Sequence, residues 1–460
     1  MKRKQESSAG RGKKLRLPKH LEHLHANAAG IDIGSRSHFV AVPEDRDPHP
    51  VREFSSFTGD LYLMADWLQQ CGIDTVAMES TGVYWIPLYE ILESRGFDVR
   101  LVNARQVKNV PGRKTDVLDC QWLQQLHTYG LLNGAFRPTD HVCALRAVSR
   151  QQQTMVRYCA AHVQHMQKAL IQMNILLHNV VSDITGLTGM RIIRAILAGE
   201  RNSHVLASLR DGRCKNSEKI IAASLVGNFR SEHLFSLRQA VDLFEFYQGK
   251  ITECDQEIAR LLARFDVRAE PESAPVPKKK TKSRKLKPDE ALCTTLHRVA
   301  GVDLTQIDGI ATDTALRIIS EVGLDMSRWP NEKHFASWLG LCPGNKVSGG
   351  KRLSGKSKPV ANKAATALRL AARSLFRSQS ALGAYLRRQK ARLGAPKAVT
   401  ATAHKLARLV YRLLKFGTEY VDAGQDYYEE RYRSRVLRNL RKKAQDFGFD
   451  LVSVGASQNC

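Results

Sequence analysis

Short apolar runs alternate with amphipathic stretches over the first quarter of the chain. Four runs rich in β-branched and aliphatic residues predict strands, at residues 31–33, 39–42, 75–78 and 99–102. Apolar residues three and four positions apart predict helices at residues 61–70, 84–94 and 117–126. Gly34-Ser35-Arg36 predicts a hairpin turn, and Gly96 predicts the end of a helix. Strands alternating with helices predict an α/β layer domain over residues 28–140.

The pattern then changes to one of long helices. Apolar residues recur at three- and four-residue steps from 142 to 179 and again from 237 to 265, with polar residues between them. This spacing predicts two long amphipathic helices that pack antiparallel as a coiled-coil arm over residues 141–267. A compact helical insert at residues 186–233 would lie at the tip of the arm. An ordinary helical bundle is the alternative.

The last part of the chain begins after a linker. Residues 268–289 are rich in proline and lysine, and the basic run 278–287 contains no acid, so we expect a disordered linker. Residues 290–425 predict a mainly helical domain. Within it, residues 302–322 contain Gly309 between two apolar stretches and predict a helix-hairpin-helix. Residues 361–376 and 400–416 predict basic helices, and residues 426–460 form a charged tail with a further helix.

Charge and composition restrict the class of partner. The chain has 460 residues and a formal charge of +26, so we expect a polyanionic partner such as DNA or RNA. Residues 1–27 form a basic arm without the apolar segment of a secretory signal, and no apolar run approaches ~20 residues, so no membrane span is predicted. Nine cysteines without a Cys-x-x-Cys pair argue against a disulfide framework and favour the cytoplasm.

Four carboxylates in the first 120 residues are the strongest chemical signal. Asp32 and Glu79 each close a predicted strand, and Asp116 and Asp119 are three residues apart on a predicted helix, which places them on one face. Converging acids would repel one another unless they shared a cation, and carboxylates with phosphate oxygens are typical ligands of divalent metals. Each acid also has an ordinary interpretation, as a turn residue, a surface carboxylate, a first-turn helix acid or a solvated side chain.

Residues close to these acids in the sequence are candidates for binding a phosphate or for packing the helix. Arg113 and Lys114 precede Asp116 and are candidates for binding a phosphate, although they could equally be surface charges. We expect Cys120, Trp122 and His127 to pack the helix behind the acids.

Four motifs together resemble those of the DEDD transposases of bacterial insertion sequences, which are understood as bridge-RNA-guided recombinases. The motifs are Gly30-Ile-Asp-Ile-Gly-Ser, Met78-Glu-Ser-Thr-Gly, Gly112-Arg-Lys-Thr-Asp-Val-Leu-Asp and Gly340-Leu-Cys-Pro followed by Ser348-Gly-Gly-Lys. The resemblance implies a ribonuclease-H-like (RuvC-like) N-terminal domain whose four acids match Asp32, Glu79, Asp116 and Asp119. It also implies an essential serine in a C-terminal transposase domain, and Ser348 matches that position.

The resemblance carries expectations about cofactors and partners. The four acids would bind Mg²⁺ or Mn²⁺, and Ser348 would form a covalent phosphoserine intermediate with DNA. Ser354 and Ser357 are rivals for that role in the same basic segment. Candidate nucleic-acid contacts there are Lys346, Lys351, Arg352 and Lys356. The protein would act as a homo-oligomer, a dimer or tetramer, with a guide (bridge) RNA that pairs with donor and target DNA. Its place would be the bacterial cytoplasm, at the nucleoid when active.

Two other functions stay open at this point. A structure-specific DNA nuclease would use the four acids and water, without a serine nucleophile. A non-catalytic protein that packages RNA or DNA would need only the charge.

Overall fold

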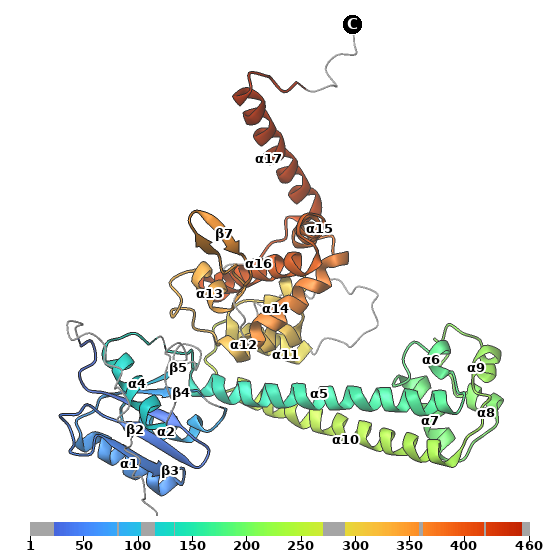
Figure 1. Ribbon diagram of the computed structural model, residues 1–460. Coiled ribbons are helices and arrows are strands. Elements are labelled where there is room, and N and C mark those ends of the chain that lie inside the picture. Colours follow the sequence, from blue (N-terminus) through green and yellow to red (C-terminus); the bar gives the residue numbers. More distant parts are fainter. Residues whose placement is uncertain are drawn as a thin grey trace, which may run out of the picture. The chain divides into compact units, whose positions relative to one another are not determined.

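The computed structural model describes residues 23–80, 82–102, 116–132, 134–269, 290–357, 362–417 and 420–452. The chain divides into two compact units, Met1–Arg137 and Pro138–Cys460. Figure 1 labels the elements of both units, and each unit is described by itself below.

A five-stranded sheet forms the centre of the first unit. Its strands are β1 (Ala28–Ile33), β2 (Ser37–Ala41), β3 (Val51–Ser55), β4 (Thr75–Glu79) and β5 (Asp98–Val102). They lie in the order β3-β2-β1-β4-β5. β2 runs antiparallel to β1 and β3, whereas β4 and β5 run parallel to β1. This mixed order is consistent with the ribonuclease-H-like fold. The four predicted strands are confirmed, and β3 is an edge strand that the apolar pattern did not predict.

Helices cover both faces of the sheet. On one face, α1 (Thr58–Gln70) and α2 (Trp85–Ser94) bury Met64, Leu68, Leu88 and Leu92 against alternate residues of the strands. On the other face, α4 (Asp116–Thr128) packs Leu123 against Ala77 and Val102. Because side chains alternate along a strand, Ile31 and Met78 face α1 and α2, whereas Gly30 and Ala77 face α4.

Gly30 allows α4 to lie unusually close to β1. A Cβ atom at Gly30 would lie 2.3 Å from the backbone nitrogen of Gln124 and 2.4 Å from the carbonyl oxygen of Cys120. Those two atoms belong to one turn of α4, so the helix backbone occupies the space that any side chain at this position would need. The contact holds the N-terminal part of α4 beside the end of β1.

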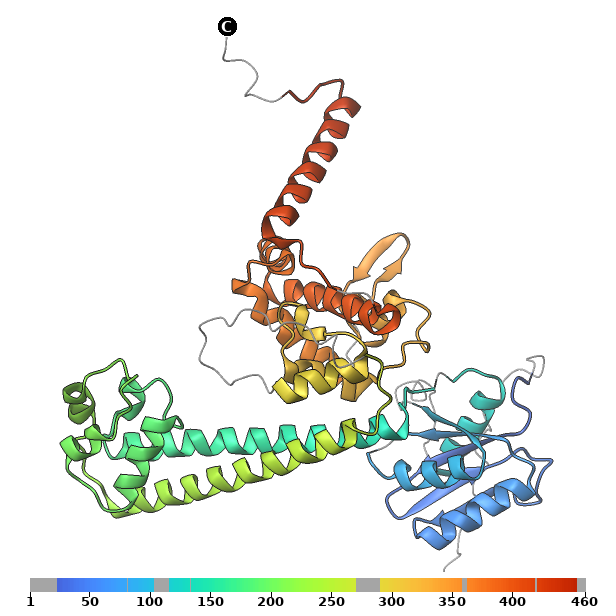
Figure 2. The same cartoon turned by 180° about the vertical axis from the view of Figure 1, so that it is seen from behind.

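Two long helices form an arm in the second unit. α5 (Asp140–Gln172) and α10 (Ser231–Leu262) lie side by side and antiparallel, as Figures 1 and 2 show from opposite sides. The prediction of one helix to residue 179 was wrong, because α5 ends at Gln172. Asn174 has a φ of 59°, and the amide of Ile175 donates to the carbonyl of Leu170, 2.8 Å away. Asparagine adopts this left-handed conformation more readily than most residues, which explains the early end. The second helix begins six residues before its predicted start.

The tip of the arm is a small helical cluster. It contains α6 (Leu177–Val180), α7 (Leu187–Leu197), α8 (Ser203–Ser208) and α9 (Glu218–Ser224). Ile192, Ile193 and Leu206 are buried here in the same apolar core as Met166 of α5 and Leu237 of α10. The helical insert between the two long helices is therefore present, while a coiled-coil geometry of the arm stays a prediction.

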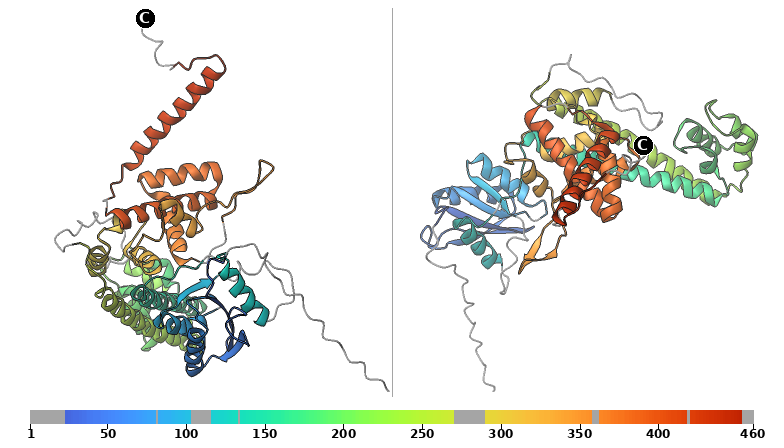
Figure 3. Two further views of the ribbon diagram at one scale, coloured as in Figure 1. Left: turned by 90° about the vertical axis from the view of Figure 1, so that its left-hand side faces the viewer. Right: turned by 90° about the horizontal axis from the view of Figure 1, so that it is seen from above.

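The remaining elements of the second unit are mainly helical. The helices are α11 (Glu290–Ala300), α12 (Thr312–Val322), α13 (Glu332–Trp338), α14 (Lys363–Ser374), α15 (Ala381–Leu393), α16 (Ala395–Phe416) and α17 (Gly424–Asp446), with short 3₁₀ turns η2 (Leu304–Gln306) and η3 (Leu375–Arg377). Tyr411 of α16 is buried against Phe335, and its hydroxyl donates to the carbonyl of Trp329 at 2.7 Å. A two-stranded hairpin, β6 (Lys346–Ser348) and β7 (Lys351–Ser354), extends from this helical part (Figure 3).

A charged clamp joins the arm to these helices. Glu321 of α12 is 6% exposed, and its carboxylate accepts two hydrogen bonds of 2.8 Å from Arg150 of α5. Arg146, one turn earlier on α5, donates to the carbonyl oxygen of Glu321 at 2.6 Å. A bidentate arginine pair at a buried carboxylate fixes both distance and orientation. The arm and α12 are therefore held together by specific bonds as well as by apolar packing.

Two sequence predictions concern other features of this unit. In the predicted helix-hairpin-helix at 302–322, only the single turn η2 and α12 are helical. Gly309 between them has a φ of 88°, and a Cβ there would lie 2.7 Å from the carbonyl oxygen of Ala371. Gly309 thus has a packing role, and DNA binding by this segment stays a prediction. Among the described residues, no helix is both long and apolar enough to span a bilayer.

Candidate functional site

Asp32 and Glu79 lie near the carboxyl ends of the neighbouring parallel strands β1 and β4, so both are at the same end of the sheet, which is called its edge below. Ile31 of β1 is in register with Met78 of β4, and the next residue on each of these parallel strands is an acid. Asp32 points to the face that α4 covers, because it is two residues after Gly30. Glu79 points the same way, because it is two residues after Ala77. Both acids are half-buried.

α4 places the other two acids at this edge. His127, near the end of the helix, contacts Thr75 at the start of β4 with 2.8 Å between Nε2 and Oγ1, and Leu123 packs on Ala77 one turn earlier. The helix therefore runs along β4 in the opposite direction to the strand. Its first turn, with Asp116 and Asp119, consequently lies towards Asp32 and Glu79. We call these four acids the carboxylate edge.

The electrostatics of Asp32 agree with this placement. The pKa of Asp32 is raised to about 6 by burial first and then by the negative charges of Asp119, Asp116 and Glu79 in that order, while the backbone amide of Ile33 opposes the shift. Like charges that face one another disfavour ionisation, so a carboxyl among three others holds its proton more tightly than usual. The four acids predicted from sequence are thus close enough for their charges to interact.

The residues of the carboxylate edge suit a divalent cation by their chemistry. Carboxylate oxygens are the ligands preferred by Mg²⁺ and similar hard cations, and a cation would relieve the repulsion that raises the pKa of Asp32. Across the described residues, no three His, Cys, Asp or Glu side chains are grouped tightly enough to hold a metal ion. A metal site at this edge therefore stays a prediction.

Ser348 lies in a β-hairpin, whereas the sequence suggested a glycine-flanked loop. It ends β6 and pairs with Lys351 of β7, across a two-residue turn of Gly349 and Gly350. Their φ angles of 55° and 75° are those that a tight primed turn requires, and glycine adopts them without steric strain. The side chain of Ser348 is exposed. We call β6, β7 and their turn the serine hairpin.

The two rival serines are less accessible. Ser354 and Ser357 are half-buried, and the hydroxyl of Ser354 accepts a hydrogen bond from the amide of Lys356 at 3.3 Å. The base of the hairpin is joined by a bond of 2.9 Å from the amide of Gly344 to the carbonyl of Lys356, and by a bridge between Pro343 and Ser357. Exposure therefore favours Ser348 among the three hydroxyls.

The predicted phosphate-binding residues are only partly described. Lys351 and Lys356 are exposed on and beside the serine hairpin. The backbone of Lys346 and Arg352 lies in β6 and β7, but the positions of their side chains are not described. Arg113 and Lys114 lie outside the described residues.

Residues behind the carboxylate edge are buried as predicted, with one addition. Cys120 and His127 are almost completely buried and Trp122 is half-buried. Burial raises the pKa of the Cys120 thiol to about 12 and lowers the pKa of His127 to about 4. Sequence reasoning missed Gly30, which sets the distance between helix and strand. The only signal was a glycine two residues before an acid in a strand.

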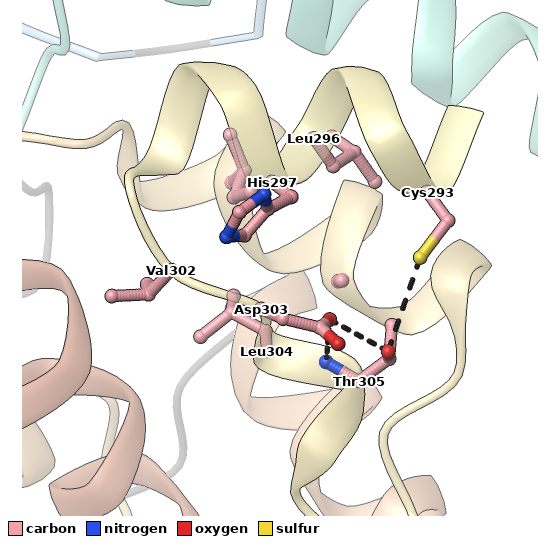
Figure 4. Close-up of a pocket in the computed structure, with 9 residues that line it drawn as sticks. Cys293, Leu296, His297, Val302, Asp303, Leu304 and Thr305 are labelled. Atoms are coloured by element: carbon pink, nitrogen blue, oxygen red, sulfur yellow. Dashed lines mark hydrogen bonds between the residues drawn. The ribbon is translucent and has the colours of Figure 1, made fainter. Parts of the chain in front are cut away.

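A small cavity lies between α11, η2 and α12 (Figure 4). It has a volume of about 10 Å³, room for a single water molecule. Asp303 faces it but already accepts hydrogen bonds from the amide and the hydroxyl of Thr305, at 2.8 and 2.6 Å. Cys293 Sγ lies 3.9 Å from that hydroxyl. The cavity is a packing feature of the helical part, too small for a substrate.

Two family models match the chain. A model of DEDD transposases of the IS110 type, described as a transposase, matches residues 29–175. A model described as transposase of the IS116/IS110/IS902 family matches residues 303–387. The first match includes all four acids of the carboxylate edge, and the second includes the serine hairpin. Together they cover about half of the chain. A search of curated proteins found no match.

Proposed function

Because this chain belongs to the IS116/IS110/IS902 family of transposases, DNA-transposing enzymes that catalyse phosphoryl transfer, we propose that it is an RNA-guided recombinase with a serine nucleophile. In this proposal it excises and inserts an insertion-sequence element by breaking and rejoining DNA strands. The family consists of enzymes, which argues against a packaging protein. The observation that carries the proposal is that the two matched segments contain the carboxylate edge and the exposed Ser348.

The proposed role of the carboxylate edge is to hold divalent metal. A DEDD transposase domain uses divalent metal ions, and we propose Asp32, Glu79, Asp116 and Asp119 as the residues that hold them here, with Mg²⁺ or Mn²⁺ as the ion. When bound, such an ion neutralises charge on the reacting phosphate and on the leaving oxygen. The raised pKa of Asp32 supports this role, because burial and, after it, the negative charges of the three other acids raise it.

The proposed role of Ser348 is nucleophilic. Its hydroxyl oxygen attacks a backbone phosphorus and loses its proton, while the bond from phosphorus to one strand breaks and that strand leaves with a free hydroxyl. The phosphate stays on the serine as a diester. A hydroxyl of another strand then attacks the same phosphorus, rejoins the backbone and returns the proton to Ser348. The diester conserves the bond energy that hydrolysis would lose. Lys351, exposed beside Ser348 in the hairpin, can offset the negative charge of the phosphate.

We propose that a guide RNA selects the DNA sites. The formal charge of +26 exceeds what one contact with a DNA site would require, and it suits a protein that binds RNA and DNA together. In this view the RNA pairs with donor and target DNA, and the protein acts as a homo-oligomer, a dimer or tetramer. Purification from the bacterial host followed by sequencing of the bound RNA tests this part: a single structured RNA encoded beside the gene is expected.

Trapping of a covalent adduct tests the chemical step. The full-length protein is incubated with nicked DNA and Mg²⁺, denatured, and separated on a gel, and the adduct is mapped by peptide mass spectrometry. We expect an adduct at Ser348 that disappears in Ser348→Ala and in Asp32→Asn. Ser354→Ala and Ser357→Ala are the matched controls and should retain it.

Each other outcome has a definite meaning. An adduct that maps to Ser354 or Ser357 would identify that serine as the nucleophile and would leave the covalent mechanism in place. Cleavage that persists without an adduct in Ser348→Ala would favour the metal-dependent nuclease, in which water attacks. Cleavage that persists in both Asp32→Asn and Asp119→Asn would rule out the carboxylate edge as the metal site.

A further inference from the structure

Helix α17 lies beyond both matched segments, and most of its residues are exposed. It spans Gly424–Asp446, and none of its residues is buried. Residues 431–443 contain seven cations and no acid: Arg431, Arg433, Arg435, Arg438, Arg441, Lys442 and Lys443. The like charges along this segment repel one another, so contacts with other parts of the protein must hold the helix in place.

The first turns of α17 are anchored to α15. Tyr428 packs edge-on against Tyr385, with ring centres 6.2 Å apart, and the guanidinium of Arg388 lies 3.4 Å above the ring of Tyr432. Arg388 also forms an ion pair with Glu429. These contacts occupy one face of the helix near its start. The later turns then continue away from α15 (Figures 1 and 3).

Four of the seven cations form a single stripe. Arg431, Arg435, Arg438 and Lys442 are spaced i, i+4, i+7 and i+11, which places them on one face of a helix over about 16 Å. All four are exposed, and within the described part of the chain none of them has a carboxylate partner. Arg435 lies seven residues after Tyr428, and its guanidinium is 5.1 Å from the ring centre of Tyr432, so the stripe begins beside the anchored face and continues past it. We call these four residues the α17 stripe.

The charge pattern selects among the partners that such a helix could bind. The same turns carry two apolar side chains, Leu437 and Leu440, which are 41% and 46% exposed. A second copy of the helix could in principle pack against them. That packing would bring two sets of seven cations together without a compensating acid, which is unfavourable unless a polyanion is present. Duplex DNA has one negative charge per ~1.7 Å of its axis, so a stripe of about 16 Å can lie along several phosphates.

We propose that the α17 stripe is a docking surface for the phosphate backbone of double-stranded DNA, outside the site of strand cleavage. The four cations contact phosphates and give affinity without reading sequence, because phosphate contacts carry no base information. The anchor on α15 holds the stripe in place before DNA arrives, which reduces the ordering cost of binding. The proposal rests on the DNA substrate of the family and not on the serine mechanism.

The salt dependence of DNA binding tests this proposal. The full-length protein is titrated with a labelled duplex of arbitrary sequence in EDTA, which keeps metal-dependent cleavage out of the assay. In R431Q/R435Q/R438Q/K442Q we expect the slope of log affinity against log salt to fall in magnitude by about 3.6, near 0.9 for each of the four lost phosphate contacts. Asp32→Asn should keep the slope of the natural protein, which separates this proposal from the catalytic one.

A control on the same helix distinguishes a stripe from bulk charge. R433Q/R441Q/K443Q removes three cations from other faces and should change the slope by less than about 1. R431K/R435K/R438K keeps the charge and should retain most of the slope. Circular dichroism checks that each variant keeps its helix content. Equal losses in the stripe variant and the off-stripe variant would overturn the proposal.

Two further experiments test whether α17 binds a partner other than DNA. L437S/L440S should leave DNA binding and oligomer mass unchanged, and a loss of mass in light scattering would assign α17 to self-association. Vesicles of phosphatidylcholine with phosphatidylserine should not bind in a stripe-dependent way. If the stripe variant lost affinity only for such vesicles or only for duplex RNA, with its DNA slope intact, the docking surface for DNA would be ruled out.

Discussion

The carboxylate edge and the serine hairpin provide the two proposed sets of reacting groups on very different supports. Each acid of the carboxylate edge lies on a strand or helix that also contributes core side chains, such as Ile31, Met78 and Leu123, which are at most 1% exposed. The serine hairpin buries almost nothing: Val347 and Leu353 are 61% and 69% exposed. One support is rigid because a core surrounds it. The other is held by its turn and a few backbone bonds.

This difference follows from what each group must do. Four like-charged carboxylates stay together only if packing elsewhere outweighs their repulsion, so they need a core behind them. A nucleophilic hydroxyl must approach a phosphate in the backbone of a large partner, so it needs exposure and little bulk around it. Substitutions that act through the core should therefore affect the carboxylate edge far more than the hairpin.

The largest expected effect is at Gly30. Gly30→Ala places a Cβ 2.3 Å from the backbone of α4, so either the helix shifts or the unit loses stability, by about 3 kcal/mol or more. Gly59→Ala in α1 is the matched control: a Cβ there meets nothing within 4 Å, and the change should stabilise by up to about 1 kcal/mol. Thermal unfolding of both variants measures the contrast. Equal melting temperatures would show that α4 does not depend on this glycine.

The same substitution in two strands should give the next largest difference. Val76 of β4 is completely buried, and Val76→Ala should destabilise the first unit by on the order of 2 kcal/mol. Val347→Ala in β6 removes a side chain that is 61% exposed and should change the stability by less than about 0.5 kcal/mol. Urea denaturation compares the two. A large loss in Val347→Ala would mean that the serine hairpin packs against more than its exposure indicates.

His127 makes the stability of the first unit depend on pH. Burial lowers its pKa from 6.5 to about 4, so the unfolded chain takes up this proton first as the pH falls. The stability that the neutral ring contributes is complete above pH ~6.5 and is lost as the pH falls from there towards ~4, by about 1–2 kcal/mol between pH 7 and 5.

Hydrogen exchange, corrected for the intrinsic rate at each pH, measures this effect in β4 and α4. His127→Gln should reduce the difference between the two pH values, although the variant is less stable at both. The amides of the serine hairpin should show no such dependence on His127. An unchanged pH dependence in the variant would assign the effect to groups other than His127, and Asp32 would not be among them, because its raised pKa acts in the opposite direction.

The smallest expected effect on stability is at the turn of the hairpin. Gly349→Ala forces alanine to a φ of 55°, at a cost of about 1 kcal/mol confined to the hairpin. Gly349→Asn is the matched control, because asparagine tolerates this conformation. We expect unchanged melting of the whole protein in both variants, and faster hydrogen exchange of Val347 and Leu353 only with alanine. If the melting temperature fell in both, the turn would contribute to the core.

Local patterns in the sequence predicted most of the elements. The apolar runs of β1, β2, β4 and β5 and the helical spacing of α1, α2 and α4 are properties of neighbouring residues, and all seven elements are present. β3 was missed because Val-Arg-Glu-Phe-Ser has too few apolar residues for an edge strand to stand out. The end of α5 was missed because it depends on one left-handed residue, Asn174.

What the sequence alone determined about this protein is its set of candidate reactive groups, their order along the chain and the spacing of Asp116 and Asp119 on one helix. The tertiary structure decided which groups meet. Asp32 and Glu79 become neighbours only through the parallel register of β1 and β4, and α4 reaches them only because Gly30 leaves room for its backbone. Arg150 pairs with Glu321, which lies 171 positions later in the sequence. Such pairings depend on strand register and close packing between distant segments, which no local pattern of residues encodes.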